Sequence, residues 1–233
     1  MPKVCRNCNN PIDTPFCPLC GQSAKVEVPT IKVFINDAIG AIFSYDAKVW
    51  RTIGKLLTKP GQLSDDYVNG KRISLMAPVT LYFWLQTLSF LSLKYFNPKL
   101  ASTADDRARS ILVMTVILAI AAGILNAYKK RRFAEHVVFS LHLNSCLLFL
   151  LMIEYAVVPG LVALLGRIGW LPSTMDAGPI ITQVAVYYLI PYTILAMRRF
   201  YGDGYPLAIA KTMCIYFFYF YVYGFVLKVY KLH

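Results

Sequence analysis

Long apolar runs recur along this chain after residue 74, and they limit the possible fold more than any other feature. A run of about 20 apolar residues is what an α-helix needs to cross the hydrocarbon core of a membrane. Charged residues make up only 15% of the chain, whereas soluble domains carry about 25%. We therefore predict an all-α integral membrane protein.

Five segments have the length and apolarity of membrane spans. We place them at about 75–96, 110–128, 137–165, 180–197 and 207–229. The third segment is longer than one crossing needs, so we expect it to be tilted or broken at Pro159-Gly160. The predicted domains are a head at 1–24, a linker with interface helices at 25–74, and a five-span domain at 75–233.

The head contains two C-x-x-C pairs, the second followed by glycine. Its four cysteines are Cys5, Cys8, Cys17 and Cys20. Tetrahedral Zn²⁺ takes four soft ligands, and each C-x-x-C pair can bring two sulfurs to one metal from a single turn. We predict a four-cysteine zinc ribbon, with a rubredoxin-like iron site and disulfides as the alternatives. Because a shell of four cysteines leaves no open coordination position, the zinc is expected to be structural.

The orientation in the membrane can be predicted in two ways. A four-cysteine zinc site needs reduced thiols, which a cytosol provides. Lys and Arg are more numerous on the side shared by the N-terminus and the loops at 129–132 and 198–211 than on the other side. The positive-inside rule therefore also places the head in the cytosol. Five spans then leave the C-terminus on the periplasmic side.

The linker contains apolar residues at helical spacing over 31–57. We expect an amphipathic helix here, with Trp50 at the depth of the lipid headgroups. It either lies on the membrane or packs on the protein's own spans, and both interpretations stay open. Pro60-Gly61 ends it. A further helical turn is expected over 63–68, with Ser64 as its cap.

Polar residues in the third segment form a candidate polar site in the membrane. They are Glu135, His136, His142, Asn144 and Glu154. A polar group at this depth is costly unless it faces the interior of the bundle. A hydrogen bond between helices is the preferred interpretation of His142, and a proton-handling pocket is the alternative. The two histidines are six positions apart, so one regular helix cannot direct both to one metal.

Basic residues beside the spans are expected to contact lipid headgroups. They are Lys71, Arg72, Lys129, Lys130, Arg131, Arg132, Arg198 and Arg199. This explains the net charge of +12 better than nucleic-acid binding does. Asp203, between two glycines, predicts a tight turn without metal-site partners. Cys146 and Cys214 are expected to be small buried side chains.

The order of the motifs resembles a bacterial family that carries domain of unknown function number 3667. The matching elements are C-x-x-C…C-x-x-C-G-Q, Lys59-Pro-Gly61, Asp66-Tyr-Val-Asn-Gly-Lys-Arg72, Pro78 and Glu135-His-Val-Val-Phe-Ser-Leu-His142. The resemblance implies placement in the bacterial inner membrane. The family pattern has a second histidine two positions after His142, but this chain has Asn144 there. The resemblance therefore implies no paired-histidine metal site.

No serine nucleophile elbow, phosphate-binding loop, dinucleotide fingerprint or zinc-protease helix occurs in the sequence. The leading hypothesis is therefore a non-enzymatic membrane protein whose zinc ribbon is a cytosolic docking or assembly module. Its expected partners are membrane lipids and a protein bound through the ribbon, and a homo-oligomer stays open. The alternative is a small-molecule or lipid transporter, or a lipid-modifying enzyme, built on the polar residues of the third segment.

Overall fold

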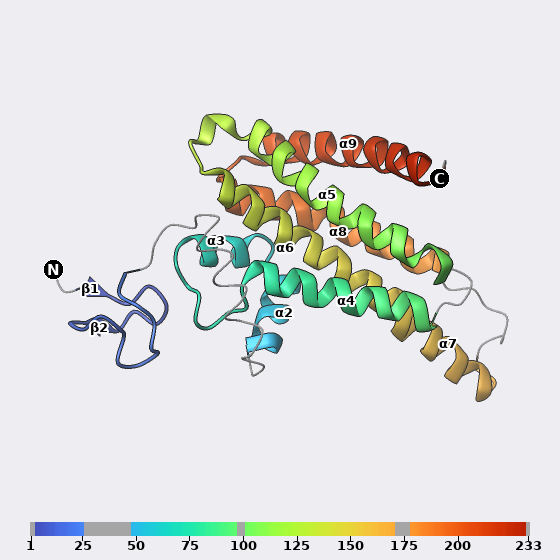
Figure 1. Cartoon of the computed structure of the whole chain (residues 1–233), viewed down its shortest axis with the longest axis horizontal. Helices are drawn as coiled ribbons and strands as arrows, with labels where there is room; N and C mark the ends of the chain where they lie inside the picture. The colour runs from blue at the N-terminus through green and yellow to red at the C-terminus, as the bar shows by residue number, and fades with distance from the viewer. Residues whose placement is uncertain (1–2, 26–47, 97–100, 171–177, 232–233) are drawn as a thin grey trace.

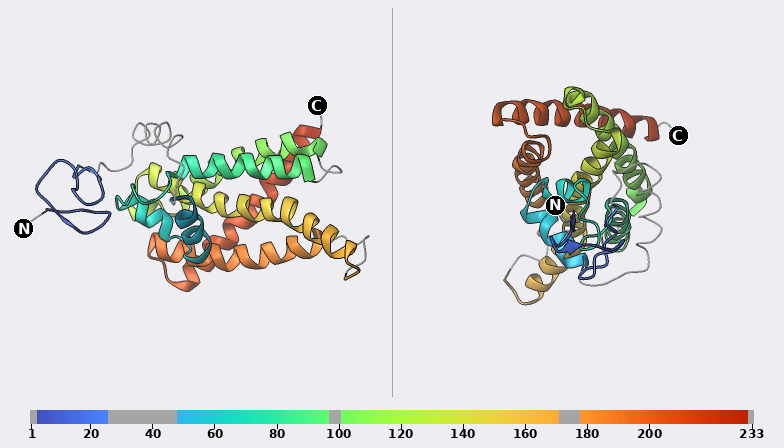
Figure 2. Two further views of the ribbon diagram at one scale, coloured as in Figure 1. Left: turned by 90° about the horizontal axis from the view of Figure 1, so that it is seen from below. Right: turned by 90° about the vertical axis from the view of Figure 1, so that its left-hand side faces the viewer.

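The computed structural model describes residues 3–25, 48–96, 101–170 and 178–231, and these ranges form a small head and a helical bundle (Figure 1). The main helices of the bundle are α4 (Pro78–Phe96), α5 (Ala104–Leu125), α6 (Phe133–Met152), α7 (Val158–Arg167), α8 (Gly178–Tyr201) and α9 (Tyr205–Lys231). The central helix is α6, which contacts α4, α5 and α8. Figure 2 shows α9 running obliquely across one side of the bundle, where it contacts α5 and α8.

The head lies at one end of the bundle (Figure 1). It contains two short strands, β1 (Lys3–Val4) and β2 (Pro11–Ile12), which pair antiparallel. Two short helices, α2 (Lys48–Thr58) and α3 (Gln62–Val68), lie between the head and α4. The α5–α6 connection, which includes the 3₁₀ turn η2 (Ala127–Lys129), and the α8–α9 connection lie at this same end.

Three helical runs of the described residues are long and apolar enough to cross a membrane. They are Ala101–Leu125, which includes the 3₁₀ turn η1 (Ala101–Thr103), Phe133–Arg167 and Tyr205–Val222. This indicates a membrane protein. Helices α4 and α8 occupy the positions of two further predicted spans and have 19 and 24 residues. Neither is among these three runs of the described residues.

The third predicted segment bends without ending. Between α6 and α7 the backbone forms η3 (Ile153–Val157), a single stretch of π-helix. Pro159 lies in the first turn of α7 and has no N–H, so it cannot bond to the carbonyl of Tyr155 one turn earlier. A wider π turn is a common way for a helix to accommodate such a missing bond. The break expected at Pro159-Gly160 is therefore a π turn just before the proline.

Helix α2 shows the amphipathic pattern predicted for the linker. Val49, Ile53 and Leu56 are buried against the protein, whereas Trp50 is 78% exposed. Its buried face contacts α3 and α6. The helix thus packs on the protein while it presents an aromatic side chain outward. The predicted helical pattern at 31–47 lies outside the described residues.

The turn between α2 and α3 depends on Gly61. Its φ is +74°, and a Cβ added there would lie 2.7 Å from the carbonyl oxygen of Ala196 in α8. Only glycine fits this combination of left-handed backbone and close approach. Gly61 also occupies the N-cap position of α3. The predicted cap at Ser64 is therefore wrong: Ser64 lies inside the helix and is buried.

Helix α8 holds the end of α2 through its side chains. The last carbonyl groups of a helix have no partner within that helix. Tyr188 donates a hydrogen bond to the carbonyl of Leu57, and Tyr192 donates one of 2.7 Å to the carbonyl of Leu56. Arg199 donates one of 3.0 Å to the carbonyl of Pro60. These bonds fasten the α2–α3 hairpin to the bundle.

The bundle core forms where α4, α5 and α6 meet. Leu81, Leu85, Met114, Phe139 and Leu148 are fully or almost fully buried there. Cys146 is buried as predicted. The same prediction for Cys214 is wrong, because this side chain is exposed on α9. Its apolar neighbours in sequence suit contact with lipid as well as burial.

Candidate metal centre and the polar sites of the bundle

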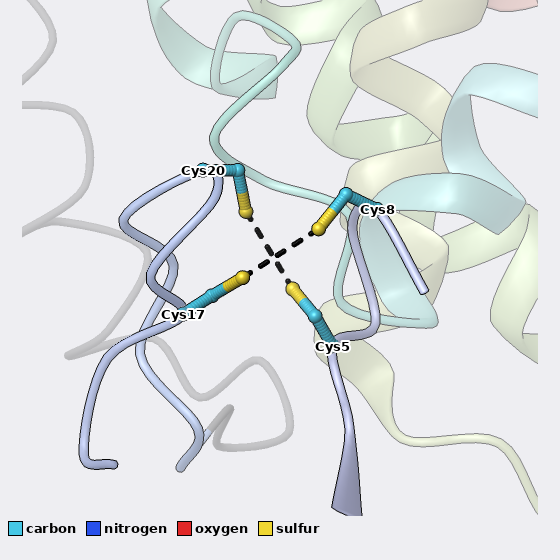
Figure 3. Close-up of side chains that lie close together, drawn as sticks. All are labelled: Cys5, Cys8, Cys17 and Cys20. Atoms are coloured by element: carbon cyan, nitrogen blue, oxygen red, sulfur yellow. Dashed lines mark hydrogen bonds between the residues drawn. The ribbon is translucent and has the colours of Figure 1, made fainter. Parts of the chain in front are cut away.

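The four head cysteines point toward one common centre (Figure 3). Their sulfur atoms all lie within 4.8 Å of one another. The Cys5–Cys20 and Cys8–Cys17 sulfur distances are 3.6 and 3.5 Å. A tetrahedral ion with metal–sulfur bonds of about 2.3 Å separates its sulfurs by about 3.8 Å, whereas a disulfide bond is about 2.05 Å long. The arrangement therefore fits a metal ion and does not contain disulfides.

The two cysteine pairs fold into equivalent turns. The N–H of Asn9 donates to the carbonyl of Cys5, and the N–H of Gly21 donates to that of Cys17, each at 2.8 Å. Asn9 and Gly21 have φ values of +62° and +71°. Asparagine and glycine adopt this left-handed region more readily than other residues. Each C-x-x-C pair, together with the residue that follows it, thus forms the same turn.

The backbone of these turns favours the thiolate form of the first cysteine in each pair. Burial alone would raise the pKa of Cys17, but hydrogen bonds from the N–H groups of Cys20 and Leu19 hold it at about 7. For Cys8, a hydrogen bond from Asn10 lowers the pKa, but burial and the neighbouring cysteines raise it to about 12. Four thiolates this close repel one another, so a cation is needed for all four to be deprotonated.

The head is attached to the bundle by polar side chains from both cysteine turns. Gln22, which is buried, donates to the carbonyl of Gly70 at 2.8 Å and accepts from the N–H of Arg72 at 3.3 Å. Asn7 accepts a hydrogen bond of 2.9 Å from Ser74. These contacts join the metal-site turns to the segment between α3 and α4.

The head also exposes apolar side chains. Val4, Phe16 and Leu19 are 57%, 63% and 71% exposed. The buried cluster inside the head contains only Ile12 and two of the cysteines. Such a small cluster cannot by itself offset the conformational entropy of folding. The described part of the head therefore combines an outward apolar surface with a very small buried core.

The polar residues of the third segment have separate partners. His142 shares a hydrogen bond of 2.9 Å with Ser64 in α3, and His136 shares one of 2.8 Å with Tyr201 in α8. The bond of His142 is the expected contact between helices. Arg131 pairs with Glu135 at 2.8 Å. The structure does not bring these side chains to one point.

The remaining members of that candidate site lie elsewhere on the same helical run. Asn144 donates to the carbonyl of Ser140 within its own helix. Glu154 lies in the π turn η3, far along the run from the two histidines. In the described part of the chain, the Nε2 of His142 and the hydroxyl of Ser145 are buried without a hydrogen-bond partner.

A buried charge cluster at the head end was missed by the sequence analysis. We name it the loop cluster: Asn126, Tyr128, Lys129, Asp203 and Lys211. The Lys211 amine donates to Asp203 at 2.6 Å, to Asn126 at 2.6 Å and to Tyr128 at 2.8 Å. Lys129 lies 3.1 Å from the other carboxylate oxygen of Asp203. Asp203 lies in the short connection between α8 and α9, and its carboxylate pairs with both Lys129 and Lys211.

The loop cluster keeps its carboxylate ionised. Burial alone would raise the pKa of Asp203, but hydrogen bonds from Lys211 and Lys129 outweigh burial and hold the pKa below its ordinary value. Lys211 offered the signal that could have revealed the cluster. It is a cation among apolar residues in the first half of α9 and is only 4% exposed, and such a residue needs an anionic partner.

The basic residues expected at lipid headgroups have varied surroundings. Lys71 pairs with Asp66 at 3.0 Å, and Arg72 lies over the ring of Tyr67. Arg131 donates to the carbonyl of Phe200 at 2.6 Å, and Arg198 lies over the ring of Tyr205. Lys130 and Arg132 are exposed. These two are the best placed for headgroup contact, which stays a prediction for the whole set.

Taken together, the described residues define a helical protein of membrane type with a head whose four cysteines lie close enough together to hold a metal ion. Residues 46–90 match the family model described as "Protein of unknown function (DUF3667)". Of the described chain, this match covers α2, α3 and most of α4, which form the segment held by the head and by α8. No curated protein and no solved structure matches the chain.

Proposed function

We propose that this chain is a multi-pass protein of the bacterial inner membrane whose zinc-loaded head is a cytosolic docking or assembly module. The observation that carries the proposal is the closed cluster of four cysteines in a head that is attached to the bundle and exposes apolar side chains. A site with four sulfur ligands leaves no coordination position for a substrate. The head therefore serves by its shape and surface.

Zinc is the metal that best suits these ligands. Cys5, Cys8, Cys17 and Cys20 supply four thiolates from two tight turns, which is the common arrangement of structural zinc sites. When bound, Zn²⁺ supplies charge neutralisation and a crosslink between the turns. The residues of the head hold the cation, orient Gln22 and Asn7 toward the bundle, and present Phe16 and Leu19 outward.

Five spans and a cytosolic head complete the proposal. Helices α4 and α8 are long enough to cross a hydrocarbon core of about 30 Å. The head and the connections that contain Lys129–Arg132 and Arg198–Asp203 gather at one end of the bundle. A shared end rich in basic residues supports the cytosolic placement by the positive-inside rule.

A protein partner at the head follows from the exposed apolar residues. Phe16 and Leu19 flank Cys17 in sequence, so the metal site fixes the backbone that carries them. Fixed, exposed apolar groups are typical anchors in protein interfaces. Lipids are the proposed neighbours of exposed apolar residues on α5 and α9, such as Val116 and Phe217. The face of α9 is also compatible with a homo-oligomer.

The test uses the full-length protein in native membranes. A photo-crosslinker is placed at Thr14, and crosslinked proteins are compared between the parent and the double variant Phe16→Ser/Leu19→Ser. We expect the double variant to retain one zinc per chain and to lose its specific crosslinked product. The matched control replaces two exposed polar residues of the head, Asp13→Ser/Lys25→Ser, and should keep the product.

Two results would contradict the docking role. One is an unchanged crosslinked product in the Phe16→Ser/Leu19→Ser variant. The other is a Cys5→Ser/Cys8→Ser variant that keeps its fold, its zinc content and its partner. The first result would show that Phe16 and Leu19 do not bind the partner. The second would show that partner binding does not need Cys5 and Cys8.

A further inference from the structure

We propose that a cleft at the end of the bundle remote from the head binds an acyl chain that carries an anionic group, with Arg107 as the anion anchor. The cleft has a volume of about 190 Å³ and lies between α4, α5, α6 and η3, with Tyr219 of α9 at its margin. The second half of α4, the start of α5 and the end of α6, which supply most of its lining, lie away from the four-cysteine head (Figure 1). The proposed site is therefore independent of the docking role of the head.

Arg107 lines this cleft without a carboxylate partner among the described residues. Its Nε donates to the hydroxyl of Thr103 at 3.1 Å, and its Nη1 donates to the hydroxyl of Tyr155 at 3.3 Å. Within the described residues, no carboxylate oxygen lies within 4.0 Å of its guanidinium. Among the described residues, two neutral hydroxyls orient the guanidinium and no carboxylate pairs with its charge.

Four other cations of the bundle have a carboxylate within about 4 Å, namely Lys129, Lys211, Arg131 and Arg109. Lys211 is paired with Asp203, and Arg131 is paired with Glu135. Arg109, two residues after Arg107, lies 4.0 Å from Asp106 and its side chain is 66% exposed. A guanidinium in a helical membrane segment is costly without an anion. Its planar fork also suits carboxylate and phosphate groups. An anion for Arg107, which the described residues do not provide, is therefore the chemistry that a ligand would supply.

The rest of the cleft suits a hydrocarbon chain. Its walls are largely apolar and include Phe90, Leu93, Ile111, Leu147 and Leu151. The small side chains of Ala104 and Ala108 also line it, on the same face of α5 as Arg107. Pockets that enclose drug-sized ligands have volumes of about 300–1,000 Å³. This smaller cleft fits one segment of an acyl chain, with the remainder of the lipid outside.

One further polar atom in the cleft is unsatisfied. The side-chain oxygen of Gln86 is buried and has no hydrogen-bond partner in the described part of the structure. A buried acceptor without a donor is costly. A hydroxyl of the ligand, or a water that enters with it, would satisfy this atom. The cleft thus lacks both an anion and a donor.

The shared chemistry of an anionic group on an acyl chain can come from an anionic phospholipid or from a free fatty acid. Both probes are therefore titrated onto the full-length protein purified in a neutral detergent. Native mass spectrometry measures the occupancy of dioleoyl-phosphatidylglycerol and of oleate, with zwitterionic dioleoyl-phosphatidylcholine as the reference. We expect one anionic probe to bind at a single site in preference to phosphatidylcholine, and the probe that binds identifies the source.

Two charge variants of neighbouring arginines form the matched comparison. Arg107→Gln should weaken binding of the anionic probe about tenfold, because charge-assisted hydrogen bonds are among the strongest polar contacts. Arg107→Lys keeps the charge but loses the planar fork, so it should weaken binding less than Arg107→Gln does. Arg109→Gln removes the same charge from an exposed position on the same helix and should leave the affinity unchanged.

A cavity-filling variant keeps the test decisive if the Arg107 variants fail to fold. Ala108→Leu fills the cleft with a larger apolar side chain and should lower occupancy by the anionic probe. The proposal is overturned if phosphatidylcholine binds as well as the anionic probes, or if Arg107→Gln and Arg109→Gln weaken binding equally. Occupancy unchanged by Ala108→Leu would also overturn it.

Discussion

The cysteine head and the loop cluster both gather polar side chains at the same end of the molecule. They differ in where the charge that balances their ionised groups comes from. The head brings together four groups that become negative when deprotonated. The loop cluster sets Asp203 between Lys129 and Lys211, so its carboxylate has two cationic partners within the chain. The head is therefore complete only with a cation, whereas the loop cluster is complete within the chain.

Of the changes considered, metal removal should have the largest effect, and it should act on the head and not on the loop cluster. Structural zinc in small Cys sites contributes about 10–16 kcal/mol of apparent binding free energy. A strong zinc chelator should therefore unfold the head and leave the bundle folded. Hydrogen exchange should show loss of protection at the amides of Cys5, Cys17 and Gly21, which are hydrogen-bonded in the turns.

The α4 to α9 helices serve as the internal reference for that experiment. Their amide protection should be unchanged by the chelator. Equal protection of residues 3–25 before and after metal removal would show that the head folds without a cation, and the contrast with the loop cluster would disappear.

Disrupting the loop cluster should lower the free energy of unfolding by less than metal removal does. Its effect should fall on the bundle rather than on the head. Lys211→Met removes the most buried cation and leaves Asp203 with only Lys129. Loss of one partner from a buried ion pair costs about 3 kcal/mol or more. We expect a lower midpoint of thermal unfolding in detergent. Lys130→Met, which removes an exposed neighbouring charge, is the control.

A double variant sharpens this result. Lys211→Met combined with Asp203→Asn removes both charges of the pair, so its cost should be smaller than the sum of the two single costs. Additive costs would mean that the two side chains do not stabilise one another.

A glycine pair tests how the α2–α3 hairpin is joined to α8. Gly61 and Gly202 both have positive φ, but only at Gly61 would a Cβ meet neighbouring backbone within 4 Å. Gly202→Ala should cost about 1 kcal/mol from backbone strain alone, and Gly61→Ala should cost more because of the added clash. Thermal unfolding of the two variants gives the difference. Equal costs would contradict the close approach to Ala196.

The smallest expected effect concerns Asp66. Burial alone would raise its pKa, but hydrogen bonds from Lys55 and Lys71 outweigh burial and lower the pKa. A carboxylate with a lowered pKa in the folded state stabilises the fold above its ordinary pKa of about 3.9. That contribution is lost as the pH falls through the folded-state value.

The corresponding measurement compares the parent with Asp66→Asn across pH. Lys71 is 40% exposed, so we expect the variant to lose at most about 1 kcal/mol at pH 7. The two proteins should converge in stability as the pH falls from about 3.9 through the lower folded-state pKa of Asp66. A constant difference at all pH values would exclude a role for the carboxylate charge.

The sequence predicted those features whose determinants lie close together in the chain. Four cysteines within 16 positions, with Asn9 and Gly21 at the turns, define the metal site almost completely. Apolar runs located the five helical segments. The start of α5 was placed late because Asp105, Asp106 and Arg107 interrupt its apolar pattern.

Features that depend on contacts between distant segments could not be predicted. Asp203 and Asn126 reach Lys211 from two separate loops. The tyrosines that hold the end of α2 are more than 130 positions away from their partners. The spacing of residues along the sequence does not predict such pairs. Tertiary packing alone brings them together.

The metal content of the full-length protein tests the central claim most directly. Protein purified from native membranes without added metal is analysed by mass spectrometry of its elements, together with Cys5→Ser/Cys8→Ser and the control Cys146→Ser/Cys214→Ser. We predict one zinc per chain in the parent and the control, and none in the head variant. Zinc absent from the parent, or retained by the head variant, would contradict the account.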